Sequence, residues 1–228
     1  MSAVSVVRTE KKYSISPYQQ NRLLYRLERI MSSDKHSGIG GYMVRSLYFD
    51  SIYDNDYFDK ISGLEVRKKI RLRIYSPEQK TVKLELKQKQ GSAQKKISLS
   101  ITKELAEEMI HGHYTGLAEL NSDLALTFYQ ILETGLYRPK CIVEYHRIAF
   151  AEECNDTRIT MDSEIGMSPF CDYFFDKQLS LIPGREETVL VVKYNGFLLS
   201  NIKQVLDFAD ASELSISKYA MSRQVLRM

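Results

Sequence analysis

The residues from 65 to 96 decide how this chain can fold. The first part reads Glu65-Val-Arg-Lys-Lys-Ile-Arg-Leu-Arg-Ile-Tyr75, and the second reads Thr81-Val-Lys-Leu-Glu-Leu-Lys-Gln-Lys89. Both parts alternate apolar and charged residues with a period of two, which is typical of strands that have one apolar and one polar face. The turn signal Ser76-Pro77-Glu78 lies between them. The stretch therefore predicts an antiparallel hairpin.

The charged face of this predicted hairpin is nearly all basic. It carries Arg67, Lys69, Arg71, Arg73 and Tyr75 from the first strand and Lys83, Glu85, Lys87 and Lys89 from the second. Two like unit charges about 4 Å apart repel by roughly 4 kcal/mol at an effective dielectric constant of about 20. Such a face is either solvated, so that salt screens the repulsion, or it binds a polyanion.

The composition limits the classes of partner. The chain has 228 residues, of which 43% are hydrophobic, and its formal net charge is only +3, so its basic character is local. A nucleic-acid-binding protein usually has a larger overall excess of positive charge, and no nucleic-acid partner is expected. No apolar run approaches the length of about 20 residues that spans a bilayer, and no signal peptide is evident at the N-terminus. Three cysteines without metal-type spacing indicate reduced thiols. We expect a cytoplasmic protein without a transmembrane segment.

Strand and helix signals occur along the whole chain. Besides the hairpin, strands are predicted at residues 4–13, 42–50, 93–101, 139–150, 157–162 and 188–194. Helices are predicted at residues 17–31, 54–61, 102–111, 122–132, 197–209 and 217–226. Residues 166–184 are predicted to form a loop. No repeat or convincing linker interrupts the sequence, so we expect a single domain over residues 1–228.

Nearly every predicted strand carries an isolated basic residue. These residues are Lys12, Arg45, Arg71, Arg73, Lys87, Lys95, Arg147, Arg158 and Lys193. Acidic residues lie among them at Glu10, Glu65, Glu85, Glu144 and Asp162. Strands that close into a barrel point one face inward. A charged interior would hold a charged, hydrated ligand, and Lys and Arg donors match phosphate oxygens.

Several short stretches resemble the VTC domain, a member of the CYTH-like, triphosphate tunnel metalloenzyme superfamily. They are Arg8-Thr-Glu-Lys-Lys-Tyr13, Val44-Arg-Ser-Leu-Tyr-Phe-Asp50, Lys69-Ile-Arg-Leu-Arg-Ile-Tyr75, Leu84-Glu-Leu-Lys87, Gln94-Lys-Lys96, Arg138-Pro-Lys-Cys-Ile-Val-Glu-Tyr-His-Arg147, Arg158-Ile-Thr-Met-Asp162, Val192-Lys-Tyr194 and Ser217-Lys-Tyr219. None is specific alone, but their order and spacing together are. The resemblance implies an α+β fold, with an antiparallel closed β-barrel or tunnel of about eight strands and helices packed outside. The basic walls of such a tunnel would bind triphosphate or inorganic polyphosphate.

The resemblance also implies roles for individual residues. The phosphate-binding set would be Lys12, Arg71, Arg73, Lys87, Lys95, Arg147, Arg158, Lys193, Ser217 and Lys218. The catalytic residues would be Arg71, Arg73, Lys87, Arg147 and Arg158. The resemblance implies a divalent metal, manganese or magnesium, and the candidate ligands that this chain itself offers for it are Glu10, Glu85 and Glu144.

Two features weaken the expected metal site. The family usually has a metal-binding glutamate two residues before the lysine at position 193, where this chain has Val191. Glu144 and Arg147 have opposite parity, so a regular strand cannot point both side chains to the same face unless it carries a bulge.

The preferred functional hypothesis is a metal-dependent phosphotransferase. Members of the family polymerise polyphosphate from the terminal phosphoryl group of ATP, so polyphosphate, triphosphate and ATP are the expected partners. One alternative is a tripolyphosphatase, in which water is the acceptor and a glutamate positions it. The other is a non-catalytic module that binds polyphosphate or inositol polyphosphate, and Val191 favours this alternative.

Overall fold

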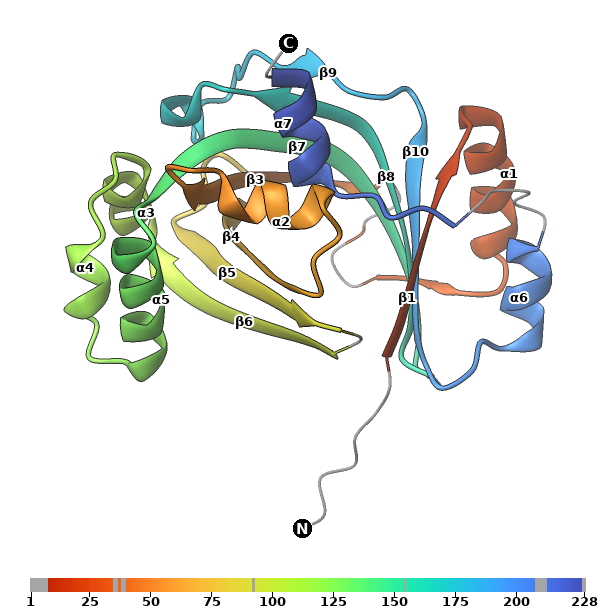
Figure 1. Ribbon diagram of the computed structural model, residues 1–228. Coiled ribbons are helices and arrows are strands. Elements are labelled where there is room, and N and C mark those ends of the chain that lie inside the picture. The colour runs from red at the N-terminus through yellow and green to blue at the C-terminus, as the bar shows by residue number, and fades with distance from the viewer. Residues whose placement is uncertain are drawn as a thin grey trace. The chain divides into compact units, whose positions relative to one another are not determined.

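The computed structural model describes residues 8–34, 37, 40–91, 93–153, 155–207 and 213–226 (Figure 1). The strands are β1 (Arg8–Ile15), β2 (Ser32–Ser33), β3 (Tyr42–Ser51), β4 (Val66–Ile74), β5 (Thr81–Gln90), β6 (Ala93–Thr102), β7 (Tyr137–Glu152), β8 (Thr157–Ser168), β9 (Ile182–Pro183) and β10 (Thr188–Asn195). The helices are α1 (Pro17–Leu27), α2 (Asn55–Ile61), α3 (Lys103–Ile110), α4 (Thr115–Ala118), α5 (Asp123–Thr134), α6 (Ser200–Leu206) and α7 (Lys218–Leu226), with a 3₁₀ turn at Cys171–Tyr173. The predicted α+β class is confirmed.

The strands form one sheet with the order β1-β10-β8-β7-β3-β4-β5-β6, while β2 pairs with β7 and β9 with β8. The strand pairs whose register is resolved are all antiparallel. The main path contains the expected eight strands. Hydrogen bonds within the described ranges do not join β1 to β6, so backbone pairing there leaves the sheet open.

The chain divides into two compact units, each built from segments that are distant in sequence. Unit 1 contains the described residues of Met1–Met43, Tyr145–Ile165 and Arg185–Ile216. Unit 2 contains those of Val44–Glu144, Gly166–Gly184 and Ser217–Met228. A single domain over residues 1–228 stays a prediction.

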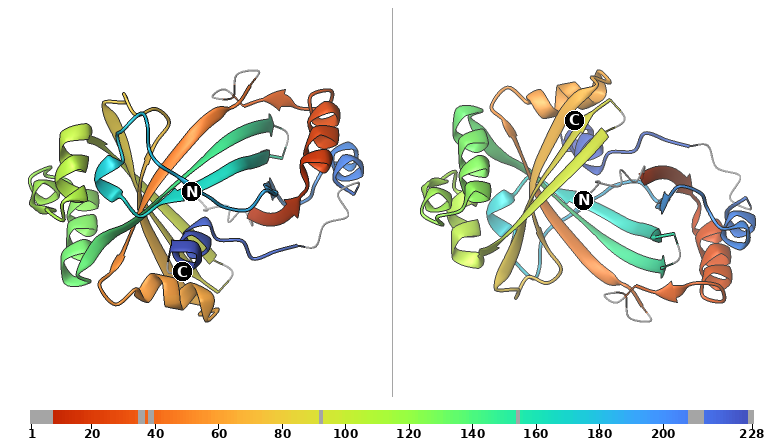
Figure 2. Two further views of the ribbon diagram at one scale, coloured as in Figure 1. Left: turned by 90° about the horizontal axis from the view of Figure 1, so that it is seen from above. Right: turned by 90° about the horizontal axis from the view of Figure 1, so that it is seen from below.

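In unit 1, two helices cover the apolar face of the strands. Helix α1 begins with a capping box, in which Ser16 Oγ accepts a hydrogen bond from the Gln19 amide and Gln19 Oε1 accepts one from the Ser16 amide. Its buried Leu23 and Leu27 belong to one core with Leu190 of β10. Helix α6 adds buried residues to the same core and lies beside α1 (Figure 2). The opposite face of these strands is left for polar residues.

In unit 2, the apolar half of the hairpin alternation is buried as predicted. Ile70 and Leu72 of β4 and Leu84 of β5 share a core with Met109 of α3 and Phe128 of α5. Helices α3, α4 and α5 lie next to one another (Figure 1). Because these helices cover the apolar face, the basic residues of β4 and β5 lie on the other face.

Some predicted boundaries differ from the structure. Strand β8 continues to Ser168, into the predicted loop, because Gly166 and Met167 pair with the two-residue strand β9. So short a strand has no period-two signal in the sequence. Helix α4 was not predicted either, because its four residues are too few to show a helical period in the sequence. Helix α6 is shorter than the predicted 197–209, and residues 208–209 of that prediction lie outside the described residues, as do residues 4–7 of the first predicted strand.

Within the described ranges, no helix is both long enough and apolar enough to cross a membrane.

Candidate phosphate-binding site

Unit 2 carries a basic face on strands β4, β5 and β6. Lys69 lies opposite Lys87, and Lys87 lies opposite Lys96, so three lysines from three strands form a cross-strand row. In the neighbouring row, Arg71 lies opposite Glu85. We call this surface the unit 2 basic face, and it consists of Lys69, Arg71, Arg73, Lys87 and Lys96, together with Glu85. Like charges directly opposite one another destabilise a sheet unless a counter-ion or solvent offsets them, and Lys96 pairs with Glu85 in the neighbouring row.

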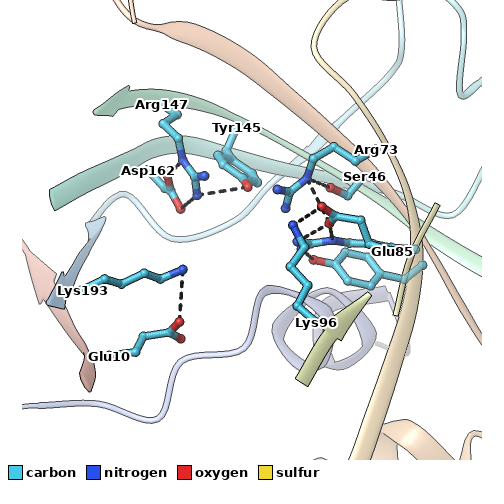
Figure 3. Close-up of polar contacts among 11 residues, drawn as sticks. Glu10, Ser46, Arg73, Glu85, Lys96, Tyr145, Arg147, Asp162 and Lys193 are labelled. Carbon is cyan, nitrogen blue, oxygen red and sulfur yellow. Dashed lines mark hydrogen bonds and ion pairs between the residues drawn. The ribbon is translucent and has the colours of Figure 1, made fainter. Parts of the chain in front are cut away.

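Glu85 is the electrostatic centre of the unit 2 basic face (Figure 3). Its side chain is 4% exposed. Its Oε2 accepts a hydrogen bond from Nε of Arg71 at 2.7 Å, and it also lies 2.7 Å from Nη2 of Arg71 and 3.8 Å from Nε of Arg73. Nζ of Lys96 lies 2.5 Å from its Oε1. Burial alone would raise the pKa of Glu85, but the charges of Arg71, Arg73 and Lys96 outweigh it and lower the pKa to about 2.

The two arginines have further contacts with β3. Nη1 of Arg71 donates to the hydroxyl of Tyr48 at 3.2 Å, and Nε of Arg73 lies 3.4 Å from Oγ of Ser46. Arg73 is 7% exposed, so its guanidinium is held in a mostly dry environment. Fixed guanidinium groups of this kind can bind phosphate oxygens with little loss of conformational entropy.

Lys95 and Lys96 lie on opposite faces of β6. Lys96 lies opposite Lys87 and contacts Glu85, whereas Lys95 lies opposite Gln88 and shares its face with Ile97 and other apolar residues. The structure therefore brings Lys96 to the unit 2 basic face and does not bring Lys95 there. The pairing of Gln90 with Ala93 fixes this register.

The start of α7 also reaches the unit 2 basic face. Nζ of Lys69 donates a hydrogen bond to Oγ of Ser217 at 2.6 Å. Lys218 is the first residue of α7 and is half-buried. Tyr219 stacks on Tyr48 with ring centroids 5.2 Å apart. The predicted Ser217 thus lies beside the row of lysines, although its sequence position is distant.

Unit 1 carries a second basic face, on β1, β10 and β8. Glu10 lies opposite Lys193, and Lys193 lies opposite Arg158. Nζ of Lys12 and Nζ of Lys193 each lie 3.2 Å from a carboxylate oxygen of Glu10. Nζ of Lys12 also donates to the carbonyl oxygen of Ile216 at 3.1 Å. We call this surface the unit 1 basic face, and it consists of Lys12, Arg147, Arg158 and Lys193, together with Glu10 and Asp162.

Arg147 is locked on the unit 1 basic face by a buried carboxylate (Figure 3). Its Nε and Nη2 donate to the two oxygens of Asp162 at 2.6 and 2.8 Å, and Asp162 is fully buried. Nη2 also lies 3.3 Å from the hydroxyl of Tyr145. Burial alone would lower the pKa of Arg147, but Tyr145 and Asp162 outweigh it and raise the pKa, so the guanidinium stays charged.

Arg158 has an acidic partner of its own. Its Nη2 lies 2.9 Å from Oδ2 of Asp34 and 3.3 Å from the hydroxyl of Tyr42. The described cations of the unit 1 basic face are therefore neutralised in large part by Glu10, Asp162 and Asp34. On the unit 2 basic face, Arg71, Arg73 and Lys96 share one carboxylate, that of Glu85.

Within unit 2, Glu144 does not share a face of the sheet with Glu85. Oε2 of Glu144 accepts a hydrogen bond from Nε of Arg45 at 2.5 Å. Arg45 is 2% exposed, and its Nη1 donates to the carbonyl oxygens of Phe174 and Asp176. Arg45 and Ser46 are neighbours in β3, so their side chains point to opposite faces of the sheet. Ser46 lies next to Arg73 on the unit 2 basic face, so the Arg45–Glu144 pair lies on the opposite face of the unit 2 sheet.

The carboxylates present do not fit a divalent metal well. Glu85 and Glu144 are on opposite faces of the unit 2 sheet, and Glu10 is already paired with Lys12 and Lys193 in unit 1. The described part of the chain contains no group of three or more His, Cys, Asp or Glu side chains that could hold an ion. Val191 lies opposite Lys12 and Thr160, so the unit 1 basic face carries an apolar side chain at this position. Manganese and magnesium prefer oxygen ligands, which these positions do not provide together.

The structure brings most of the predicted residues into these two groups. Lys12, Arg147, Arg158 and Lys193 lie in unit 1, while Arg71, Arg73, Lys87 and Ser217 lie in unit 2. Sequence reasoning omitted Lys69, although its alternation with Arg71 already placed it on the same face. It also omitted three residues that position the cations, namely Ser46, Tyr48 and Tyr145, whereas Asp162 was already among the acidic residues expected beside the basic ones. Their contacts cross between strands, and no spacing rule in the sequence identifies such contacts.

Comparison with known proteins agrees with the observed fold. A model of the VTC domain family matches residues 7–227. A solved protein from Bacillus halodurans, named "putative adenylate cyclase", has 14% sequence identity and a TM-score of 0.55, with 92% of this chain and 94% of that chain covered. A protein of the same name from Vibrio parahaemolyticus has 12% identity and a TM-score of 0.51, with 99% of this chain and 100% of that chain covered. No curated protein sequence matches the chain.

Proposed function

This chain belongs to the VTC domain family, and we propose that it binds a linear chain of phosphate groups, as tripolyphosphate or inorganic polyphosphate, on its basic faces. The observation that carries this proposal is the cross-strand row of Lys69, Lys87 and Lys96. Three ammonium groups in adjacent strands repel one another, and a bound polyanion relieves the repulsion. The neighbouring Arg71 and Arg73 add planar donors that match phosphate oxygens.

A thermal-shift experiment tests the proposal. The protein is heated with orthophosphate, tripolyphosphate, long-chain polyphosphate or ATP at equal phosphate concentration. A ligand at about 100 times its dissociation constant stabilises the folded state by roughly 2.7 kcal/mol. We expect tripolyphosphate and polyphosphate to raise the melting temperature more than orthophosphate. No shift with any of the four anions would contradict the proposal.

Phosphoryl transfer from ATP to polyphosphate is the second candidate function. The observation that favours it is the rigid placement of Arg71 by Glu85 and of Arg147 by Asp162. The transition state of phosphoryl transfer needs positioning and charge neutralisation, and preorganised cations supply both. Acid-insoluble polyphosphate formed from ATP in the presence of manganese or magnesium would support this function, and no product across a range of metals would defeat it.

The tripolyphosphatase alternative has less support. Hydrolysis requires a group that positions or deprotonates water, and a general base works best with a pKa near the operating pH. Glu85 has a pKa of about 2 and is bound by three cations, so it is a poor base. Release of orthophosphate from tripolyphosphate would nevertheless identify this activity directly.

A further inference from the structure

We propose that this chain binds its polyanion in the metal-free form, so that divalent cations compete with the protein for the ligand instead of bridging the two. This inference rests on the proposed function, because it concerns the same basic faces. A metal-bridged site needs carboxylate oxygens that are free to turn toward an ion. The contacts of Glu10, Asp162 and Glu85 show that these oxygens already serve as counter-ions for the protein's own cations.

In unit 1, both carboxylates are held by basic side chains. Glu10 lies between Lys12 and Lys193, with one oxygen 3.2 Å from each ammonium group. Asp162 is fully buried and accepts a hydrogen bond from Arg147 on each of its oxygens. Turning either carboxylate toward a metal ion would break these pairs and leave a cation without its counter-ion.

The position between Lys12 and Thr160 offers no ligand either. Val191 occupies it and is 6% exposed. An aliphatic side chain there supplies no oxygen ligand for a metal ion. Magnesium keeps most of its hydration shell and binds proteins through a few carboxylates and waters, so an apolar centre disfavours it.

In unit 2, the charge around Glu85 is unfavourable for a cation. Arg71, Arg73 and Lys96 all lie within 4 Å of its carboxylate, which leaves a local excess of two positive charges. A divalent ion at this carboxylate would meet that excess, whereas a phosphate oxygen would be attracted by it. Lys96 is the most exposed of the three, with 53% of its side chain accessible, and can turn toward a ligand.

The experiment measures tripolyphosphate binding by calorimetry in two buffers. One contains EDTA, and the other contains magnesium in excess over the ligand. We expect saturable binding in EDTA and a clearly lower affinity with magnesium, because the metal chelates the ligand's oxygens. Equal affinity in both buffers, or binding that appears only with magnesium or manganese, would overturn the inference while leaving the proposed function intact. No binding in either buffer would overturn both.

Variants of Glu10 give a second readout that does not depend on activity. If Glu10 is a counter-ion, Glu10→Gln removes a negative charge next to Lys12 and Lys193, and the affinity for tripolyphosphate in EDTA should rise several-fold. The matched control is Glu213→Gln, because Glu213 pairs with Lys11, which lies on the opposite face of β1. The control should leave the affinity unchanged. Unchanged or weaker binding of the Glu10 variant, with folding intact by circular dichroism, would contradict the inference.

Discussion

The hydroxyl of Tyr219 lies 2.5 Å from Oδ2 of Asp50 and donates a hydrogen bond to that fully buried carboxylate. Asp50 also accepts hydrogen bonds from the amides of Ser51, Asp56 and Tyr57. The contact therefore joins α7 to the end of β3 and to α2. Because Ser217 and Lys218 immediately precede Tyr219, the same contact fixes the segment that brings Ser217 to Lys69.

The Tyr219–Asp50 bond should contribute measurably to stability. Tyr219→Phe keeps the ring that stacks on Tyr48 but removes the donor to a buried carboxylate. Hydrogen bonds to charged groups contribute about 1.5–3 kcal/mol, so we expect the free energy of unfolding to fall by that amount in urea titrations. Tyr53→Phe is the control, because Tyr53 is 69% exposed and should tolerate the change. Equal stability of the two variants would contradict the account.

The two adjacent lysines of β6 should behave differently toward the ligand. Lys96→Ala removes an ammonium group from the unit 2 basic face, and Lys95→Ala removes one from the other face. We expect Lys96→Ala to weaken tripolyphosphate binding about tenfold, which corresponds to ~1.4 kcal/mol. Lys95→Ala should bind nearly as the unchanged protein does. Calorimetric titration measures both, and a larger loss for the Lys95 variant would count against the assigned register.

Acid should weaken the fold through Glu85. The pKa of Glu85 is lowered to about 2 in the folded protein, so its stabilising contribution is present above the ordinary pKa of a glutamate and is lost as the pH falls toward 2. At about 1.4 kcal/mol per pKa unit, the contribution is at most about 3 kcal/mol. The measurement is the free energy of unfolding between pH 2 and 6. Glu85→Gln should show a shallower decline with acid than the unchanged protein, and parallel curves would refute this assignment.

Asp56 should make the fold less stable as the pH rises, whereas Glu85 makes it less stable as the pH falls. Burial is the main cause that raises its pKa to about 7, and the charge of Asp50 adds to it, while Tyr137 donates to both of its oxygens. A folded state that binds a proton more tightly than the unfolded chain loses stability as the pH rises from about 4 to 7. Asp56→Asn keeps an oxygen acceptor for Tyr137 and cannot titrate. The stability of this variant relative to the unchanged protein should therefore increase between pH 4 and 7, and a constant difference would contradict the assignment.

Gly41 should be required for the backbone beside Arg147. It has a φ of +82°, and a Cβ built on it would lie 2.5 Å from the carbonyl oxygen of Arg147. A residue other than glycine that is forced into such a backbone conformation lowers the free energy of unfolding by about 1–3 kcal/mol. We expect Gly41→Ala to lower the melting temperature clearly. Gly40→Ala is the matched control, since a Cβ there meets nothing within 4 Å, and equal melting temperatures would disprove the assignment.

The period of two in the sequence was sufficient to predict the hairpin and its faces. Ile70, Leu72 and Leu84 are buried, and Arg71 and Glu85 lie on the other face, as the alternation indicates. The same alternation predicted that Glu144 and Arg147 point to opposite faces of their strand. These predictions succeeded because a strand's side-chain alternation is a local property of the backbone.

Contacts between strands were harder to predict. The family resemblance assigned Lys95 to the phosphate-binding set, although its alternation with Ile97 and Leu99 already placed Lys95 on the apolar face of the strand and Lys96 on the polar face. The hydrogen-bond register decides that Lys96 lies opposite Lys87 and next to Glu85, and the sequence does not contain this register. The partners of Arg147 and Arg158 depend in the same way on packing between segments distant in sequence, such as Asp34 with Arg158.

Calorimetric titration of tripolyphosphate into the unchanged protein and into an Arg71→Ala/Lys87→Ala variant tests the central claim most directly. We expect saturable binding to the unchanged protein, and the affinity should fall as salt screens the charges. In the variant, most of this binding should be lost. Binding of equal strength to both proteins, or no binding to the unchanged protein at low salt, would contradict the claim.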